Sequence, residues 1–88
     1  MNIWELAILK SISSRGGKAD TKSIYVDLTS GKFINLEDKH LLSTVHGGRP
    51  AYQHQVRSHL SNLKQTGNLT KVSRGIYSIT DSGRKRIA

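Results

Sequence analysis

The sequence predicts an α+β domain in which three to four helices are followed by a small C-terminal β-hairpin. Up to Gly67 the apolar residues recur every three or four positions, which is typical of helices that bury one face. After Gly67 they alternate in two short runs separated by a glycine-containing turn, which is typical of a hairpin. At 88 residues the chain has the length of one domain, so residues 1–88 are expected to fold as a single unit.

Three helices are expected in the first half of the chain. The first spans about residues 3–14 and ends at the pair Gly16-Gly17. The second spans about residues 21–28, with Asp20 or Thr21 as its N-cap. A short third helix is expected to begin near Asn35 and to run through residues 37–42. The apolar residues that predict the first helix are Ile3, Trp4, Leu6, Ala7, Ile8, Leu9 and Ile12.

The clearest helix spans about residues 50–66. It starts at Pro50, a residue suited to a first helical turn, and stops at Gly67, a residue suited to a helix C-terminus. The hairpin follows over about residues 69–80, with Ser73-Arg74-Gly75 as its turn, and Thr80 begins a last turn or short helix. The apolar stripe of the long helix consists of Tyr52, Val56, Leu60 and Leu63, at steps of four, four and three.

The charge of the chain is strongly positive and unevenly distributed. There are 14 Lys and Arg residues against 6 Asp and Glu, a net charge of +8. Residues 1–44 are nearly balanced, whereas in residues 45–88 Asp81 is the single acidic residue among eight basic ones. This segregation favours a surface that binds a polyanion over an ordinary solvated face.

The order of the elements, with a long helix directly before a hairpin, is that of a winged helix-turn-helix. The long helix has an apolar back and a donor-rich front, which is what a recognition helix in the major groove of double-stranded DNA needs. The hairpin would then be the wing, on the DNA backbone or in the minor groove. The residues expected to contact DNA are Arg49, Tyr52, Gln53, His54, Arg57, Ser61, Lys64, Lys71, Arg74 and Arg84.

The residues predict no catalytic site, no metal site and no cofactor. Cysteine is absent, which removes thiolate ligands and nucleophiles. His54 and His59 are five residues apart and so do not form the i,i+4 pair that chelates a metal on a helix. The six carboxylates are scattered, whereas a nuclease needs a cluster that holds a divalent ion. No apolar run approaches the roughly 20 residues of a membrane span, so a soluble, cytoplasmic protein with no membrane partner is expected.

Two segments of the chain resemble a known family. They are residues 52–67, with the helix end Leu63-Lys64-Gln-Thr-Gly67, and residues 74–83, which read Arg-Gly-Ile-Tyr-Ser-Ile-Thr-Asp-Ser-Gly. Both are similar to the Mrr-type N-terminal domain of modification-dependent restriction endonucleases. The resemblance implies a winged helix that reads DNA beside a fused or associated nuclease domain. It implies DNA-facing roles for Arg49, the long helix and Arg74, and core-facing or capping roles for Tyr77, Ile79 and Thr80.

Two alternatives to a restriction module stay open. One is a small free-standing transcriptional regulator that binds a palindrome as a homodimer and uses apolar residues of the first helix for the dimer contact. The other is a winged helix used for protein–protein interaction, in which the long helix meets an acidic partner. The preferred DNA sequence, and whether a methylated or hydroxymethylated base is read, are also open at this point.

Overall fold

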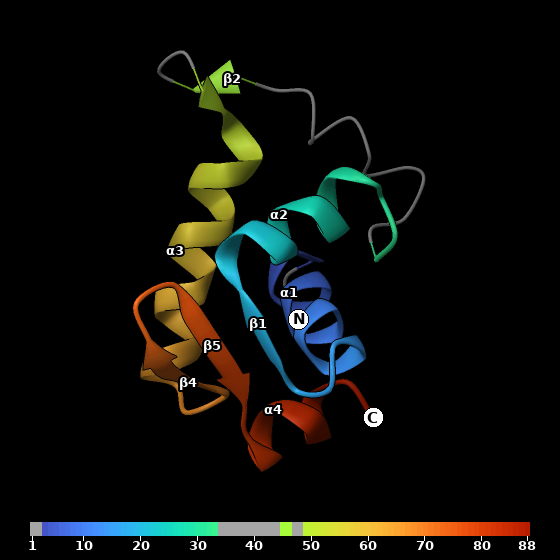
Figure 1. Cartoon of the computed structure of the whole chain (residues 1–88), viewed down its shortest axis with the longest axis vertical. Coiled ribbons are helices and arrows are strands. Elements are labelled where there is room, and N and C mark those ends of the chain that lie inside the picture. The colour runs from blue at the N-terminus through green and yellow to red at the C-terminus, as the bar shows by residue number, and fades with distance from the viewer. Residues whose placement is uncertain (1–2, 34–44, 47–48) are drawn as a thin grey trace.

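The computed structural model describes residues 3–33, 45–46 and 49–88, with side chains for all of these except residues 45–46 and 49–52. The predicted short helix over residues 35–42 lies outside the described residues. Figure 1 shows α3 along one side of the molecule, α1 and α2 beside it, and α4 at the far end from α2. The elements are α1 (Ile3–Ser14), β1 (Lys18–Asp20), α2 (Thr21–Thr29), β2 (Val45–His46), β3 (Arg49–Pro50), α3 (Ala51–Gln65), β4 (Leu69–Ser73), β5 (Ile76–Ile79) and α4 (Asp81–Arg86).

The predicted hairpin is part of a three-stranded antiparallel sheet with the strand order β1-β5-β4. The hairpin itself is confirmed, since β4 pairs with β5 and places Leu69 opposite Ile79. The third strand, β1, pairs Ala19 with Tyr77 on the other side of β5. The three residues of β1 are exposed, buried and exposed in turn, a pattern too short to predict a strand, so pairing with β5 and not local sequence accounts for it. This α+β arrangement agrees with the winged-helix prediction.

The core lies between α1, α3, α2 and the sheet. Because α1 packs against α2, α3 and β5, its apolar residues are covered from several sides. The homodimer alternative would place four residues at an interface, of which Trp4, Ile8 and Leu9 are buried in this core and Leu6 is half-buried. The buried apolar residues are Trp4, Ala7, Ile8, Leu9, Ile12, Ala19, Ile24, Leu28, Val56, Leu60, Leu63, Leu69 and Ile79.

The helix ends confirm the predicted capping residues. The Asp20 side chain accepts a hydrogen bond from the Ser23 N–H at 2.9 Å and so caps α2, which decides between the two predicted candidates. The Thr80 hydroxyl accepts from the Gly83 N–H at 3.1 Å and caps α4. At the C-terminus of α3, Gly67 has φ +81°, the left-handed conformation that glycine adopts without cost.

The start of the long helix differs from the prediction. Helix α3 begins at Ala51, and Pro50 belongs to the two-residue strand β3, which pairs with Val45 of β2. Proline tolerates this position because a two-stranded ladder leaves one side of each strand without a partner strand. Gly47 and Gly48, whose backbone N–H groups the sequence makes candidates for holding a phosphate before this helix, lie outside the described residues.

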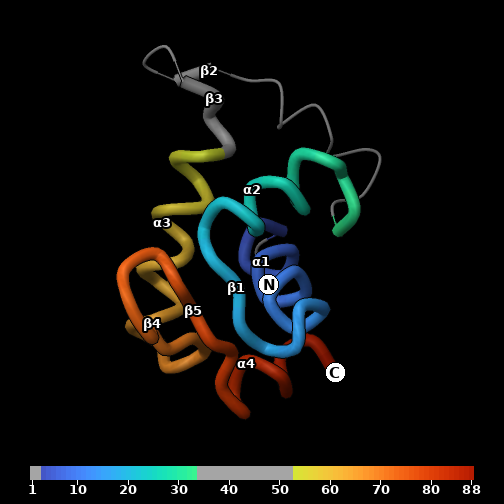
Figure 2. The backbone as a smooth tube through the Cα atoms, viewed as in Figure 1, coloured from blue at the N-terminus to red at the C-terminus, as the bar shows by residue number. Residues whose placement is uncertain are grey.

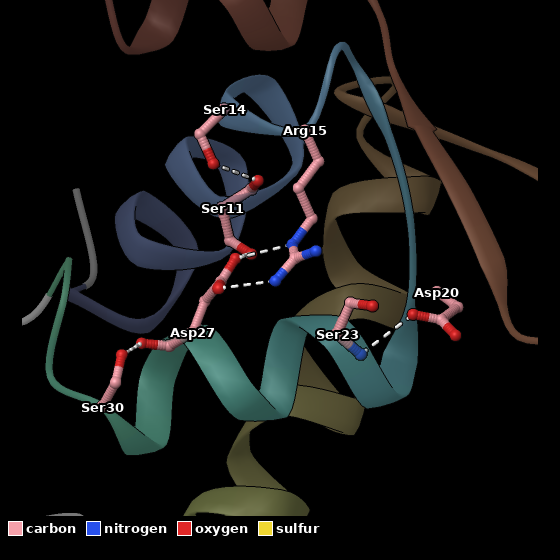
Figure 3. A network of polar contacts seen from close by, with 7 residues as sticks. All are labelled: Ser11, Ser14, Arg15, Asp20, Ser23, Asp27 and Ser30. Atoms are coloured by element: carbon pink, nitrogen blue, oxygen red, sulfur yellow. Dashed lines mark hydrogen bonds and ion pairs between the residues drawn. The ribbon is translucent and has the colours of Figure 1, made fainter.

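A buried carboxylate joins α1 to α2 (Figure 3). Asp27 is 6% exposed and accepts hydrogen bonds from Arg15 Nε at 2.9 Å and Arg15 Nη2 at 2.8 Å. The Ser11 hydroxyl donates to the same carboxylate at 2.7 Å. These three bonds satisfy a charge that would otherwise be costly to bury, and they set the position of α2 against α1.

Candidate nucleic-acid interface

A groove with a volume of about 650 Å³ opens where α2, α3 and the β4–β5 hairpin meet. Helix α2 contributes its first two turns, α3 contributes its middle, and the hairpin contributes residues at and beside its turn. In Figure 2 the β4–β5 turn lies beside α3 and the start of α2. The described residues that line the groove are Thr21, Lys22, Tyr25, Arg57, Leu60, Lys71, Arg74 and Tyr77.

Four of the groove residues are cations that come from three different elements. Lys22 belongs to α2, Arg57 to α3, and Lys71 and Arg74 to the hairpin, and all four are exposed. None of the described residues that line the groove is acidic. The site is therefore a concentrated positive potential that is open to solvent, as expected for a surface that binds phosphates.

The hairpin turn is attached to the first residue of α2. Thr21 donates its backbone N–H to the Gly75 carbonyl oxygen at 2.9 Å, and its hydroxyl donates to the same oxygen at 3.3 Å. This contact holds the turn with Arg74 next to Lys22. The hairpin turn is thus docked against α2, and its cation Arg74 lines the groove.

A register shift in the hairpin sets which side chains reach the groove. Lys71 pairs with Tyr77 and Ser73 with Ile76, so Val72 is an extra, unpaired residue between them. Such a bulge re-aims the strand close to the turn. Lys71 and Tyr77 lie opposite each other in the ladder, and both line the groove.

The outward part of α3 carries the other donors that the sequence predicts. Val56, Leu60 and Leu63 are buried, so the opposite side of the helix faces solvent. His54, Ser61 and Lys64 are exposed there, and Gln53 is half-buried beside Tyr25 and Lys22 in an adjoining pocket of about 530 Å³. The face that would enter a major groove is therefore continuous with the basic groove.

Arg57 is held by a neighbour across the groove. Its Nε donates a hydrogen bond to the hydroxyl oxygen of Tyr25 at 3.2 Å. Tyr25 lies on α2, 32 residues earlier in the chain, and its ring packs against the core. The middle of α3 is thereby connected to α2 through a polar contact at the surface.

Three carboxylates are engaged away from the groove. Glu5 contacts His59 Nδ1 at 2.9 Å and Arg86 Nη2 at 3.5 Å. The hydrogen bonds from Arg15 and Ser11 hold the pKa of Asp27 below its ordinary value, and those from Ser23 lower the pKa of Asp20. Both groups stay ionised at neutral pH. None of these three carboxylates is among the described residues that line the groove.

The relationship to known proteins agrees with the predicted resemblance. The family model of the Mrr N-terminal domain matches residues 4–88 of the chain. The chain belongs to this family. No curated protein sequence matches this Mrr N-terminal domain significantly. Within its described residues, no helix is long and apolar enough to cross a membrane, and no three His, Asp or Glu side chains gather where they could hold a metal ion.

The sequence-predicted contact residues of this Mrr N-terminal domain fall into separate groups. Arg57, Lys71 and Arg74 are brought together in the groove. Arg84 lies apart from these three, on α4, which follows the end of β5 opposite the hairpin turn. Its guanidinium is close to Gly17. The side chains of Arg49 and Tyr52 are not described. The remaining four, on α3, are Gln53, His54, Ser61 and Lys64.

The sequence prediction missed the contribution of α2 to the site. Thr21, Lys22 and Tyr25 line the groove, and Tyr77 completes it from β5. A signal was present, because positions 21, 22 and 25 share one side of a helix. Helical spacing alone indicates only that Tyr25 packs inward, although a phenol can pack with its ring and bind with its hydroxyl.

Proposed function

We propose that this Mrr N-terminal domain binds double-stranded DNA as the non-catalytic reading module of a restriction system. The observation that carries the proposal is the convergence of four cations from three elements on one groove, with no acidic residue among its described lining. Family membership supports a role next to a nuclease domain. The cationic groove supports DNA as the ligand, because phosphates supply most of the affinity in such complexes.

The proposed binding mode divides the side chains into two groups. The exposed side of α3 lies in the major groove, where His54 and Ser61 reach base edges. Lys22, Lys71 and Arg74 contact phosphates on either side of that helix. Lys64, in the last turn of α3, adds a further phosphate contact.

The test is fluorescence anisotropy with labelled duplexes over a range of salt concentrations. If about six phosphates are neutralised, the logarithm of the binding constant falls with the logarithm of salt at a slope near −5. Four duplexes of one sequence are compared: unmodified, or carrying N6-methyladenine, 5-methylcytosine or 5-hydroxymethylcytosine. A preference of about tenfold for one modified duplex identifies a modification-dependent module. Equal, salt-sensitive binding to all four identifies a general DNA-binding module.

The control is a triple variant, Lys22→Gln with Lys71→Gln and Arg74→Gln. These exposed side chains make no hydrogen bond or ion pair with the described residues, so the variant is expected to fold. Because it lacks three cations, its salt slope is expected to be shallower by about three. Absence of binding to any duplex at low salt, in a folded wild-type protein, contradicts the proposal. That result would favour the protein-interaction alternative.

A further inference from the structure

Among the four groove cations, Arg57 differs in how it is held. Its Nε donates to the Tyr25 hydroxyl, whereas no hydrogen bond or ion pair from the described residues restrains Lys22, Lys71 or Arg74. An unrestrained Lys or Arg suits a phosphate, which accepts a cation from many directions. A restrained guanidinium suits a ligand that requires one orientation.

The hydrogen bond from Nε also determines which part of Arg57 is presented. The guanidinium is planar, so fixing the direction of the Nε–H bond fixes the plane of the group. Tyr25 occupies the side that contains Nε, and the outer edge with the two terminal nitrogens is not engaged by Tyr25. That edge offers two parallel N–H donors, which match the O6 and N7 acceptors of guanine in the major groove.

The Tyr25 side chain is suited to hold this orientation. Its ring is partly buried against the core, and a packed phenol has few rotamers, so its hydroxyl is a fixed acceptor. Arg57 has a long flexible stem that would lose rotamer entropy on being ordered by DNA alone. The contact with Tyr25 restricts part of that freedom before DNA binds, which favours a specific over a non-specific contact.

We propose that Tyr25 is a specificity-determining positioning residue, which orients Arg57 to read a single guanine in the DNA. This inference rests on the proposed function, since it assigns a base contact within the same interface. It predicts that the Tyr25 hydroxyl influences the choice of base at one position. The overall electrostatic affinity, which comes from the other cations, is expected not to depend on it.

The experiment is selection of bound duplexes from a pool with randomised base pairs. It uses the wild-type chain and the variants Tyr25→Phe, Arg57→Lys and Lys10→Gln. The wild type is expected to enrich guanine at one position by about tenfold over other bases. Tyr25→Phe and Arg57→Lys are both expected to reduce that preference to about threefold or less, at the same position. Lys10→Gln, which changes an exposed cation of α1 that does not line the groove, is expected to retain it.

A second measurement uses the selected duplex with 7-deazaguanine at that position, which removes the N7 acceptor. The wild type is expected to lose about tenfold in affinity, whereas Tyr25→Phe changes little because its Arg57 is no longer oriented. The salt slope of Tyr25→Phe stays that of the wild type. Phenylalanine keeps the packed ring, and an unchanged thermal midpoint shows that the variant folds as the wild type does.

Two results overturn this inference and leave DNA binding in place. One is salt-sensitive binding by the wild type without any selected guanine. The other is a guanine preference that does not depend specifically on Tyr25, because Tyr25→Phe retains it or Lys10→Gln reduces it to the same extent. If the wild type binds no duplex at low salt, the proposed function fails as well, and the two failures are thereby distinguished.

Discussion

Thr21 and Gly75 are joined by two hydrogen bonds to one oxygen atom, since the Thr21 N–H and hydroxyl both donate to the Gly75 carbonyl. The residues are 54 positions apart, at the start of α2 and in the turn of the hairpin. Lys22 and Arg74, the chain neighbours of these two residues, both line the basic groove. The turn of the wing and the start of α2 therefore behave as one structural unit.

Gly75→Ala is expected to destabilise the domain by about 1 kcal/mol, which corresponds to a fall of about 4–8 °C in thermal midpoint. The cost lies in the backbone, because Gly75 has φ +75° while the nearest atom to an added Cβ is Thr21 Oγ1 at 3.9 Å. Thermal unfolding followed by circular dichroism measures it. Ser73→Ala, at an exposed position of the same hairpin, is the control and is expected to stay within about 0.5 kcal/mol. An unchanged midpoint for Gly75→Ala would show that the hairpin turn changes its backbone conformation without a measurable cost in stability.

Gly83→Ala is expected to destabilise the domain although alanine favours helices. An added Cβ would overlap the Asn68 carbonyl oxygen and lie 2.8 Å from Ile79 Cγ1. The Asn68 oxygen already accepts the Thr80 N–H at 3.1 Å, so it has little room to move. Overpacking of about 1–3 kcal/mol outweighs a helix-propensity gain of about 1 kcal/mol.

Urea unfolding of Gly83→Ala measures the balance of these two effects. Ser82→Ala changes an exposed neighbour in α4 and serves as the matched control, with an expected effect near zero. A gain in stability for Gly83→Ala would mean that α4 moves away from Asn68 easily.

Asp27→Asn is expected to lower the free energy of unfolding at neutral pH by about 2–3 kcal/mol, because charged hydrogen bonds to Arg15 and Ser11 are lost or weakened. The folded-state pKa of Asp27 is lowered, so its contribution is present above the unfolded pKa and is lost as pH falls through the folded pKa. The stability difference between wild type and variant should therefore shrink below about pH 4. Urea titrations from pH 7 to pH 2 test this, with Asp81→Asn as an exposed control. A difference independent of pH would show that Asp27 acts through packing and not through its charge.

Lys22→Ala is expected to weaken binding to every duplex by a similar factor and to make the salt slope shallower by about one. Lys22 lines the groove, whereas Lys10 is an exposed cation of α1 that does not. Lys10→Ala is thus the matched control, with the slope of the wild type. Anisotropy titrations at four salt concentrations measure both slopes. If Lys22→Ala and Lys10→Ala have the same salt slope, the bound DNA does not pass over the start of α2.

Much of the fold follows from local sequence. Apolar spacing predicts the bounds of α1, and the long helix is predicted to within one residue at its start, because an amphipathic helix must bury one stripe. The hairpin follows from two short alternating runs around Gly75. Strand β1 could not be predicted in this way, because its three residues are extended only through pairing with β5.

The candidate site was partly predictable. Arg57, Lys71 and Arg74 stand out because they lie on the polar side of an amphipathic helix and in a hairpin within the basic half of the chain. Lys22 and Tyr25 do not stand out, because residues 1–44 are nearly neutral in total. Their role depends on the positions that α2 and α3 take around α1, against which both pack, and the buried Asp27 contact joins α2 to α1.

The amino-acid sequence by itself determined the helices, the hairpin, the excess of positive charge in residues 45–88 and the family to which the chain is similar. These are properties of spacing and composition, which act over a few neighbouring residues. The tertiary structure alone decided that Lys22, Arg57 and Lys71 share one groove and that Tyr25 holds Arg57. The physical reason is that these contacts join residues tens of positions apart, and only the packing of α2, α3 and the sheet around one core brings them together.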